Sequence, residues 1–292
     1  MRTRQLIGDL LVHSQLFMAF SGVCFVYVIS RLLVGVAPDF IWLWASATGI
    51  LGLHLIDSVR SADHEDMISQ PRRALLYREW RGPALIMSAF LLGLTGVLLL
   101  VAGARLWILI CFCALGILAA SYVFPLFTLF QSRRGQLASL KDLARLKPIS
   151  ISFAWLSGAF LVALAQPLDS GRPFPLVALL FLIVAAAPFL LLDSIWLDRR
   201  DRLADESYDR RTFAVRMSGA SFRVVCMLLY LIPFMGLFGP VTGLQGFILG
   251  GMAGAALMVI FDPDQIGSEA LRVVFAGLWR ITSLLGFLLF LP

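Results

Sequence analysis

The chain has 292 residues, of which 60% are hydrophobic and only 14% are charged. Soluble chains carry about 25% charged residues and about 45–50% apolar ones. The composition therefore excludes an ordinary soluble enzyme, a nucleic-acid-binding module and a disordered scaffold, and it is typical of a membrane protein. The formal net charge of +6 is interpreted as an excess of arginine on one side of a bilayer, not as a nucleic-acid-binding charge.

Nine apolar stretches are candidates for crossing a bilayer, which takes a helix of about 20 mostly apolar residues. In chain order they are Leu10–Leu33, Phe40–Ile56, Ala84–Val101, Leu106–Phe130, Ile149–Ala165, Pro175–Leu192, Val224–Leu237, Gly243–Ile260 and Val273–Leu291. No small-residue cleavage site closes the first stretch, so we expect a spanning helix there and not a signal peptide. The sequence predicts an all-α membrane protein, with one domain over residues 1–292 that forms a single bundle of nine transmembrane helices.

The basic residues predict the orientation of this bundle. Three long polar loops, at about 57–83, 131–148 and 193–223, and the N-terminus would lie on one side of the membrane. All Lys and Arg residues fall on that side except Arg31, Arg105, Arg172 and Arg280. Since cytoplasmic loops carry an excess of Lys and Arg, we expect a cytoplasmic N-terminus, a C-terminus on the opposite side, and any active site at the cytoplasmic face of what is expected to be a bacterial inner membrane.

Acidic residues are scarce, yet they gather directly after the second and sixth apolar stretches. The two clusters are Asp57, Asp63, Glu65 and Asp66, and then Asp193, Asp198, Asp201, Asp205, Glu206 and Asp209. Carboxylates three or four residues apart share a helix face and repel one another. Such a stripe is either a solvated helix neutralised by its arginine neighbours or part of a Mg²⁺ site, because Mg²⁺ takes one or two carboxylates together with phosphate oxygens and waters.

Asp198, Asp201 and Asp205 form the pattern DxxDxxxD. The same pattern is the second aspartate motif of the UbiA superfamily of membrane-embedded prenyltransferases, which this chain resembles. In that family a GxRTLPV-like stretch follows, and its tail is matched here by Arg211, Thr212, Ala214 and Val215. Asp209 stands where the family usually has Gly.

The first acidic cluster matches the family only in part. Segment 66–75 is similar to the xINKPxRPL-like stretch that follows the family's first motif, NDxxDxxxD, and it aligns Asp66 with the last aspartate. The middle aspartate then falls on Ala62. Asp57 and Asp63 supply acids only after a small shift, and the family's Asn is missing. The first motif therefore departs from the family pattern.

A third segment adds to the resemblance. Tyr122 to Pro125, Leu140-Lys141, Lys147-Pro148 and Trp155 are similar to the family's Y-x-x-P … LK … K … W segment between the fourth and fifth helices. The resemblance covers most of the chain. It implies a prenyltransferase that moves an isoprenoid group from an allylic prenyl diphosphate to an acceptor, either a small molecule or a quinone-like precursor, with Mg²⁺ assisting departure of the diphosphate. The expected partners are this substrate and membrane lipid, with no nucleic acid.

The same resemblance implies roles for particular residues. The metal ligands would be Asp57, Asp63, Asp66, Asp198, Asp201 and Asp205. The catalytic residues would be Asp66, Asp198, Asp201, Asp205, Lys141 and Tyr122. The substrate-binding residues would be Arg73, Lys147, Asp57, Asp63 and Arg211.

Two other functions stay open because the first motif is altered. One is a UbiA-type terpene cyclase, and the other is a protein without catalytic activity, either a relative that serves as a lipid-binding or assembly subunit or a small-solute transporter. Three polar residues inside apolar stretches are not assigned by the motifs. A lone histidine such as His54 is more often structural than a base, Asp193 is a functional candidate because it lies within the membrane, and Arg280 needs a partner that the sequence does not identify.

Overall fold

The computed structural model describes residues 13–63, 65–123, 147–165, 176–207, 212–239, 241 and 243–290. This part of the chain is helical and has no strand, so the predicted all-α class is confirmed. The long helices are α2 (Leu16–Val34), α3 (Phe40–Ser61), α6 (Arg81–Val101), α7 (Leu106–Val123), α8 (Lys147–Ala165), α9 (Leu176–Arg200), α12 (Gly219–Leu231), α13 (Leu244–Ile260) and α14 (Glu269–Leu289). The short ones are α4 (Glu65–Ser69), α5 (Pro71–Glu79), α10 (Arg202–Ser207), α11 (Phe213–Arg216) and the 3₁₀ helices η2 (Ile232–Phe238) and η3 (Pro263–Gln265).

Seven of these helices are long and apolar enough to cross a membrane by length and composition: α2, α3, α6, α8, α9, α12 together with η2, and α14. Two further apolar helices, α7 and α13, are shorter. The protein is therefore a multi-pass, all-α membrane protein. Each of the nine predicted stretches overlaps one of these helices, although residues 10–12, 124–130, 175 and 291 of the predicted stretches lie outside the described part.

The ends of the helices follow from local chemistry. Gly35 ends α2 in the left-handed conformation, with φ at 77°, and its N–H donates to the carbonyl of Arg31, as is common at helix C-termini. Pro71 begins α5, where its missing N–H costs nothing. Ser218 and Ser268 cap α12 and α14, since each side chain accepts a backbone N–H of the first turn.

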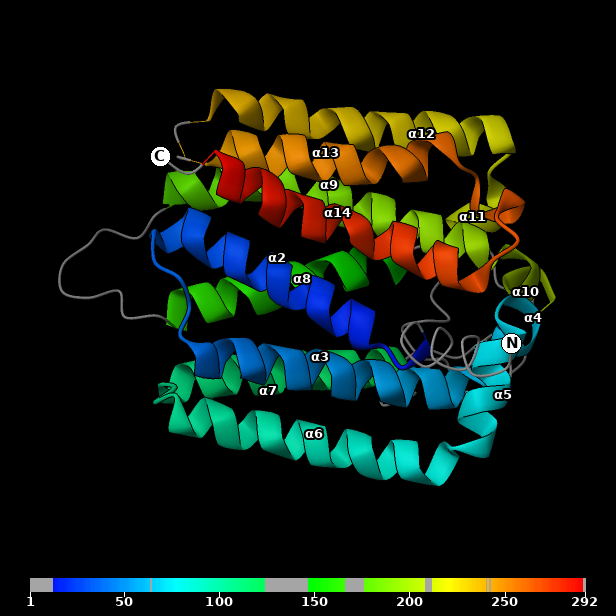
Figure 1. Ribbon diagram of the computed structural model, residues 1–292, viewed down its shortest axis with the longest axis horizontal. Coiled ribbons are helices and arrows are strands. Elements are labelled where there is room, and N and C mark those ends of the chain that lie inside the picture. Colours follow the sequence, from blue (N-terminus) through cyan, green and yellow to red (C-terminus); the bar gives the residue numbers. More distant parts are fainter. Residues whose placement is uncertain are drawn as a thin grey trace.

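The long helices run side by side, and the short ones gather at one end of the bundle (Figure 1). Helices α3, α6 and α7 form one part, α9, α12, α13 and α14 form another, and α2 and α8 lie between them. A continuous core joins the parts; in it, the rings of Phe189 and Trp279 stack with centroids 5.3 Å apart. Helices α4, α5, α10 and α11 lie at the end where α3 and α9 finish, so both acidic clusters reach the same end of the molecule.

Candidate functional site

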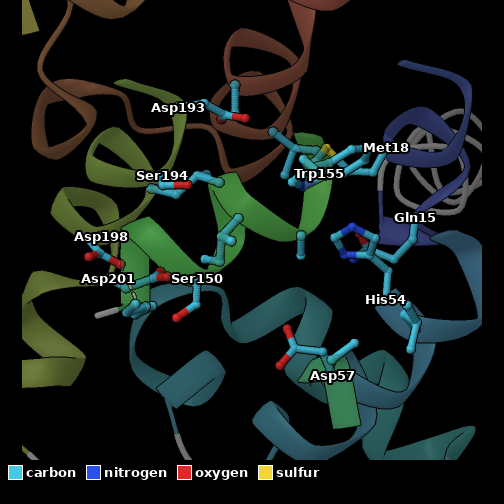
Figure 2. A pocket seen from close by; sticks show the side chains of 18 of the residues that line it. Gln15, Met18, His54, Asp57, Ser150, Trp155, Asp193, Ser194, Asp198 and Asp201 are labelled. Carbon is cyan, nitrogen blue, oxygen red and sulfur yellow. Dashed lines mark ion pairs between the residues drawn. The ribbon is translucent and has the colours of Figure 1, made fainter. Parts of the chain in front are cut away.

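A cavity of about 240 Å³ lies between α2, α3, α5, α7, α8, α9 and α14. Its wall is strongly charged for the interior of a membrane protein. Four carboxylates and four basic side chains line it: Asp57, Asp193, Asp198, Asp201, Arg73, Lys147, Arg200 and Arg280. Figure 2 shows the four carboxylates around one space: Asp193, Asp198 and Asp201 come from α9 and the residue after it, and Asp57 comes from α3. We call this space the polar cavity.

The second acidic cluster contributes two carboxylates from the end of α9 and the residue after it. Asp198 is 1% exposed, and its carboxylate lies 2.7 Å from the ammonium of Lys147, the first residue of α8. Asp201 receives two hydrogen bonds from the guanidinium of Arg200, at 2.9 and 2.8 Å. Since α9 ends at Arg200 and α10 begins at Arg202, the expected carboxylate stripe is interrupted at Asp201. Asp205 is fully buried but does not line the polar cavity.

Asp66 of the first acidic cluster does not line the polar cavity itself, but it binds Arg73, which does. Asp66 is 1% exposed and accepts two hydrogen bonds from Arg73, at 2.9 and 2.6 Å. Burial alone would lower the pKa of Arg73, but the negative charge of Asp66 and these hydrogen bonds outweigh it, so the pKa of Arg73 is raised. Arg73 lines the cavity and Asp66 lies behind it. The guanidinium is thereby held in place and remains charged.

The two clusters meet through Gln70. With its amide oxygen directed toward them, Gln70 accepts hydrogen bonds from Arg73 at 3.3 Å and from Arg200 at 3.1 Å. These arginines belong to segments far apart in the sequence. Helix α4, which carries Asp66, also packs against α10. The structure thus brings together residues of both predicted motifs at one end of the bundle.

Asp57 and Asp63 belong to the same acidic cluster but are placed differently. Asp57 lines the polar cavity from the last part of α3. Asp63 lies beyond the end of α3 and forms ion pairs with Arg81 at 2.7 Å and Arg78 at 3.3 Å. Its side chain is 32% exposed, and it does not line the cavity.

The deepest charges of the cavity pair with each other. Arg280 of α14 donates a hydrogen bond to Asp193 of α9, and both side chains are almost fully buried. The guanidinium also lies over the rings of Trp155, at 4.6 Å from the ring centroid, and Trp279, at 5.0 Å. Sequence reasoning noted both charges separately and missed the pair. The signal available was that each is a rare charge within an apolar stretch and that they have opposite sign.

A second cavity, of about 420 Å³, adjoins the polar one and is lined mainly by aliphatic and glycine residues of α3, α6, α7 and α8. We call it the apolar cavity. The two cavities have five lining residues in common: Leu53, His54, Ala119, Ala154 and Trp155. A charged space and a hydrocarbon-like space therefore meet at one wall, which suits a ligand with a charged head and an apolar tail.

The described residues offer a partial fit to a metal ion. Within the described ranges, no three His, Cys, Asp or Glu side chains come close enough together to hold a metal by themselves. Mg²⁺ does not require such a group, because phosphate oxygens and waters supply most of its ligands. The carboxylates of Asp57, Asp198 and Asp201, which share the polar cavity, are of the right chemical type. Three predicted site residues, the side chain of Tyr122 and residues Lys141 and Arg211, lie outside the described part of the chain.

No family model, curated protein or solved structure matches the chain in comparisons with known proteins. The fold and the two cavities therefore define the class of protein: a multi-pass α-helical membrane protein with a charged cavity that shares one wall with an apolar cavity.

Proposed function

We propose that the protein is an integral-membrane prenyltransferase that transfers an isoprenoid group from an allylic prenyl diphosphate to an acceptor. The observation that carries the proposal is the pairing of the two cavities, one charged and one apolar, with residues of both predicted aspartate motifs at the charged one. A prenyl diphosphate has the same division into an anionic head and a hydrocarbon tail. The resemblance of the motifs to the UbiA superfamily supports the same substrate.

The diphosphate would bind in the polar cavity. Arg73 and Lys147 would supply positive charge to the phosphate oxygens, with Lys147 acting as a point charge. Mg²⁺, when bound, would neutralise the negative charge that develops on the departing diphosphate. Asp57, Asp198 and Asp201 are the carboxylates that we propose to hold it, since they line the cavity while Asp63, Asp66 and Asp205 do not. Asp66 would serve to fix Arg73.

The ion pairs of this site have a consequence for binding. Lys147 and Arg200 are engaged with Asp198 and Asp201. When the metal and the diphosphate bind together, Asp198 and Asp201 would pair with the metal, and Lys147 and Arg200 would pair with the diphosphate. No buried charge would then be left uncompensated. Buried charges are costly unless they are paired, and this exchange lets the site keep its charges paired both with and without substrate.

The isoprenoid tail would lie in the apolar cavity, where it is removed from water by aliphatic side chains. Exclusion of water also protects the reactive allylic carbon from hydrolysis. We further propose the nine-span topology with a cytoplasmic N-terminus, which follows from the basic loops and puts the charged cavity near the cytoplasmic face, where a soluble acceptor or diphosphate would enter from the cell interior of a bacterium.

Two other functions remain as alternatives. In a terpene cyclase of the same fold, water or an internal alkene would take the place of the acceptor. A non-catalytic lipid-binding or assembly subunit is favoured by one observation: Asp66, Asp193, Asp198 and Asp201 each form an ion pair with a basic side chain. Such a protein would bind a phosphate-bearing lipid without a metal.

The test is diphosphate release by the full chain, purified in detergent, from farnesyl diphosphate and longer allylic diphosphates with Mg²⁺ or with a chelator. We expect Mg²⁺-dependent release that falls about 10²-fold or more in Asp198→Asn and Asp201→Asn. Glu206→Gln is the matched control, because Glu206 is an exposed acid of α10 away from the cavity. Binding of the diphosphates without release, and equally with the chelator, would favour the non-catalytic alternative. Analysis of the products formed without an acceptor separates transfer from cyclisation.

A further inference from the structure

His54 is the residue with acid–base chemistry at the wall between the two cavities. Of the five residues common to both linings, Leu53, Ala119 and Ala154 are aliphatic and Trp155 carries only an N–H donor. The imidazole of His54 has a nitrogen that can accept a proton. In Figure 2 the ring is seen between Trp155 and Asp57. Sequence reasoning interpreted this histidine as structural, and its position in the fold points to another role.

The contacts of His54 leave its ring available. Its side chain is partly exposed to the cavity, and the ring centroid lies 6.3 Å from that of Trp155. Among the residues that the structure describes, no hydrogen bond is formed by the imidazole; the hydrogen bond recorded at His54 is the one that its backbone carbonyl accepts from Ser58. A structural histidine in an apolar helix is expected to satisfy its ring nitrogens within the protein, and His54 does not do so among these residues.

The position of the wall identifies where bond cleavage would occur. If the diphosphate occupies the polar cavity and the hydrocarbon tail the apolar cavity, the carbon that joins them must pass the five residues that line both. In that arrangement, His54 would lie beside the reacting carbon. A base must come within hydrogen-bond reach of the proton that it removes, and at this wall His54 is the side chain that can do so.

We propose that His54 is the base that accepts the proton released in the reaction, an inference that rests on the proposed prenyltransferase function. The C–O bond breaks, and its electron pair leaves on the diphosphate. With an acceptor present, the acceptor atom bonds to the allylic carbon and its proton passes to the imidazole. Without an acceptor, a C–H bond next to the allylic cation breaks, its electron pair forms a new C=C bond, and the same imidazole takes the proton. The proton is later lost from His54 to solvent at the polar end.

The experiment uses the full chain in detergent with farnesyl diphosphate and Mg²⁺ and no acceptor. Released diphosphate, farnesol and the hydrocarbon farnesene are quantified together. Wild type is expected to form farnesene. In His54→Ala, farnesene formation falls about 10²-fold, in the range that general bases contribute, while diphosphate release is largely retained and farnesol takes the place of the hydrocarbon. Added imidazole restores farnesene formation in His54→Ala, where the side chain has left a space, but not in His54→Gln, where the amide fills it.

His13→Gln is the matched control, since His13 is buried outside both cavities and its substitution should leave the ratio of farnesene to farnesol unchanged. Thermal stabilisation by farnesyl diphosphate verifies that His54→Ala still folds and binds. Equal farnesene formation by wild type and His54→Ala would overturn the inference, as would diphosphate release by wild type with farnesol as the sole product. Absence of diphosphate release from wild type would remove the proposed function itself, and the inference with it.

Discussion

Glycines play opposite parts in two regions of the bundle. Along the contact between α13 and α14, a Cβ added at Gly250 would lie 2.9 Å from the carbonyl carbon of Thr282 and 3.1 Å from the Cα of Gly286. Around the apolar cavity, a Cβ added at Gly116 or Gly158 would meet no atom within 4 Å. In the first region glycine lets two backbones touch, and in the second it leaves a space empty.

The importance of close packing between α13 and α14 follows from the lipid that surrounds a membrane protein. Lipid is as apolar as the helices, so helices in a membrane are held by close packing and hydrogen bonds instead of by the hydrophobic effect. The tight contact of α13 with α14 supplies such packing. The helices around the apolar cavity lack it at Gly116 and Gly158. Helix α14 takes part in both regions, because its glycine side faces α13 while Arg280 faces the polar cavity.

The largest expected effect comes from breaking the ion pair on the cavity side of α14. Arg280→Leu leaves Asp193 as an uncompensated buried charge, which should lower the free energy of unfolding by about 3–5 kcal/mol. Denaturation of the full chain in detergent measures it. The double variant Asp193→Leu with Arg280→Leu removes both charges and should recover most of the loss; if the double variant is no more stable than Arg280→Leu, the pair is not the cause.

The next largest loss of unfolding free energy is expected from a substitution between α13 and α14. Gly250→Val forces a side chain against the backbone of α14 and should cost about 1–3 kcal/mol of unfolding free energy, as overpacking does. Gly93→Val on α6 is the matched control, since a Cβ there meets nothing within 4 Å. Equal stability of the two variants in the same denaturation assay would contradict the role given to this helix contact.

At the end where the short helices gather, Tyr77 donates a hydrogen bond of 2.8 Å to the backbone carbonyl of His13. Tyr77→Phe should cost about 1 kcal/mol. Burial raises the pKa of Tyr77 above its ordinary value of 10.0. The neutral phenol therefore contributes stability that is complete below pH 10 and is lost as the pH rises through the higher value of the folded protein. Unfolding measured against pH should show this alkaline loss in wild type and less of it in Tyr77→Phe.

The smallest effect on stability is expected in the apolar cavity. Gly158→Val should leave the free energy of unfolding unchanged within about 0.5 kcal/mol, because the added atoms enter open space. The same atoms occupy room that the isoprenoid tail would use, so the thermal stabilisation produced by farnesyl diphosphate should fall. A variant that binds farnesyl diphosphate as well as wild type does would show that the tail lies elsewhere.

The comparison also shows which parts of the fold could be predicted from the sequence. The apolar stretches predicted the positions of the long helices, because hydrophobicity over about 20 residues is a local property of the chain. The helix-face argument for Asp198, Asp201 and Asp205 was less accurate, since α9 ends at Arg200 and Asp205 does not line the cavity. Helix α10, which follows the break, packs against α4, a contact between distant segments that no local pattern encodes.

The candidate site, like the fold, could be predicted from the sequence only in part. Motif spacing selected Asp57, Asp198, Arg73 and Lys147, all of which line the polar cavity. It also selected Asp63, whose ion pairs with Arg78 and Arg81 hold it at the surface. Spacing along the chain predicts which residue types are present near a helix end, but the direction of each side chain depends on the neighbours it meets.

By itself, the amino-acid sequence determined that the chain is an all-helical membrane protein with two acidic clusters that each follow an apolar helix. The reason is that composition and the lengths of the apolar stretches are local properties of the sequence. Only the tertiary structure decided that Arg280 pairs with Asp193, that Gln70 lies between Arg73 and Arg200, and that His54 stands where the two cavities meet. The physical reason is that these contacts join residues far apart in sequence, and their geometry depends on how the helices pack.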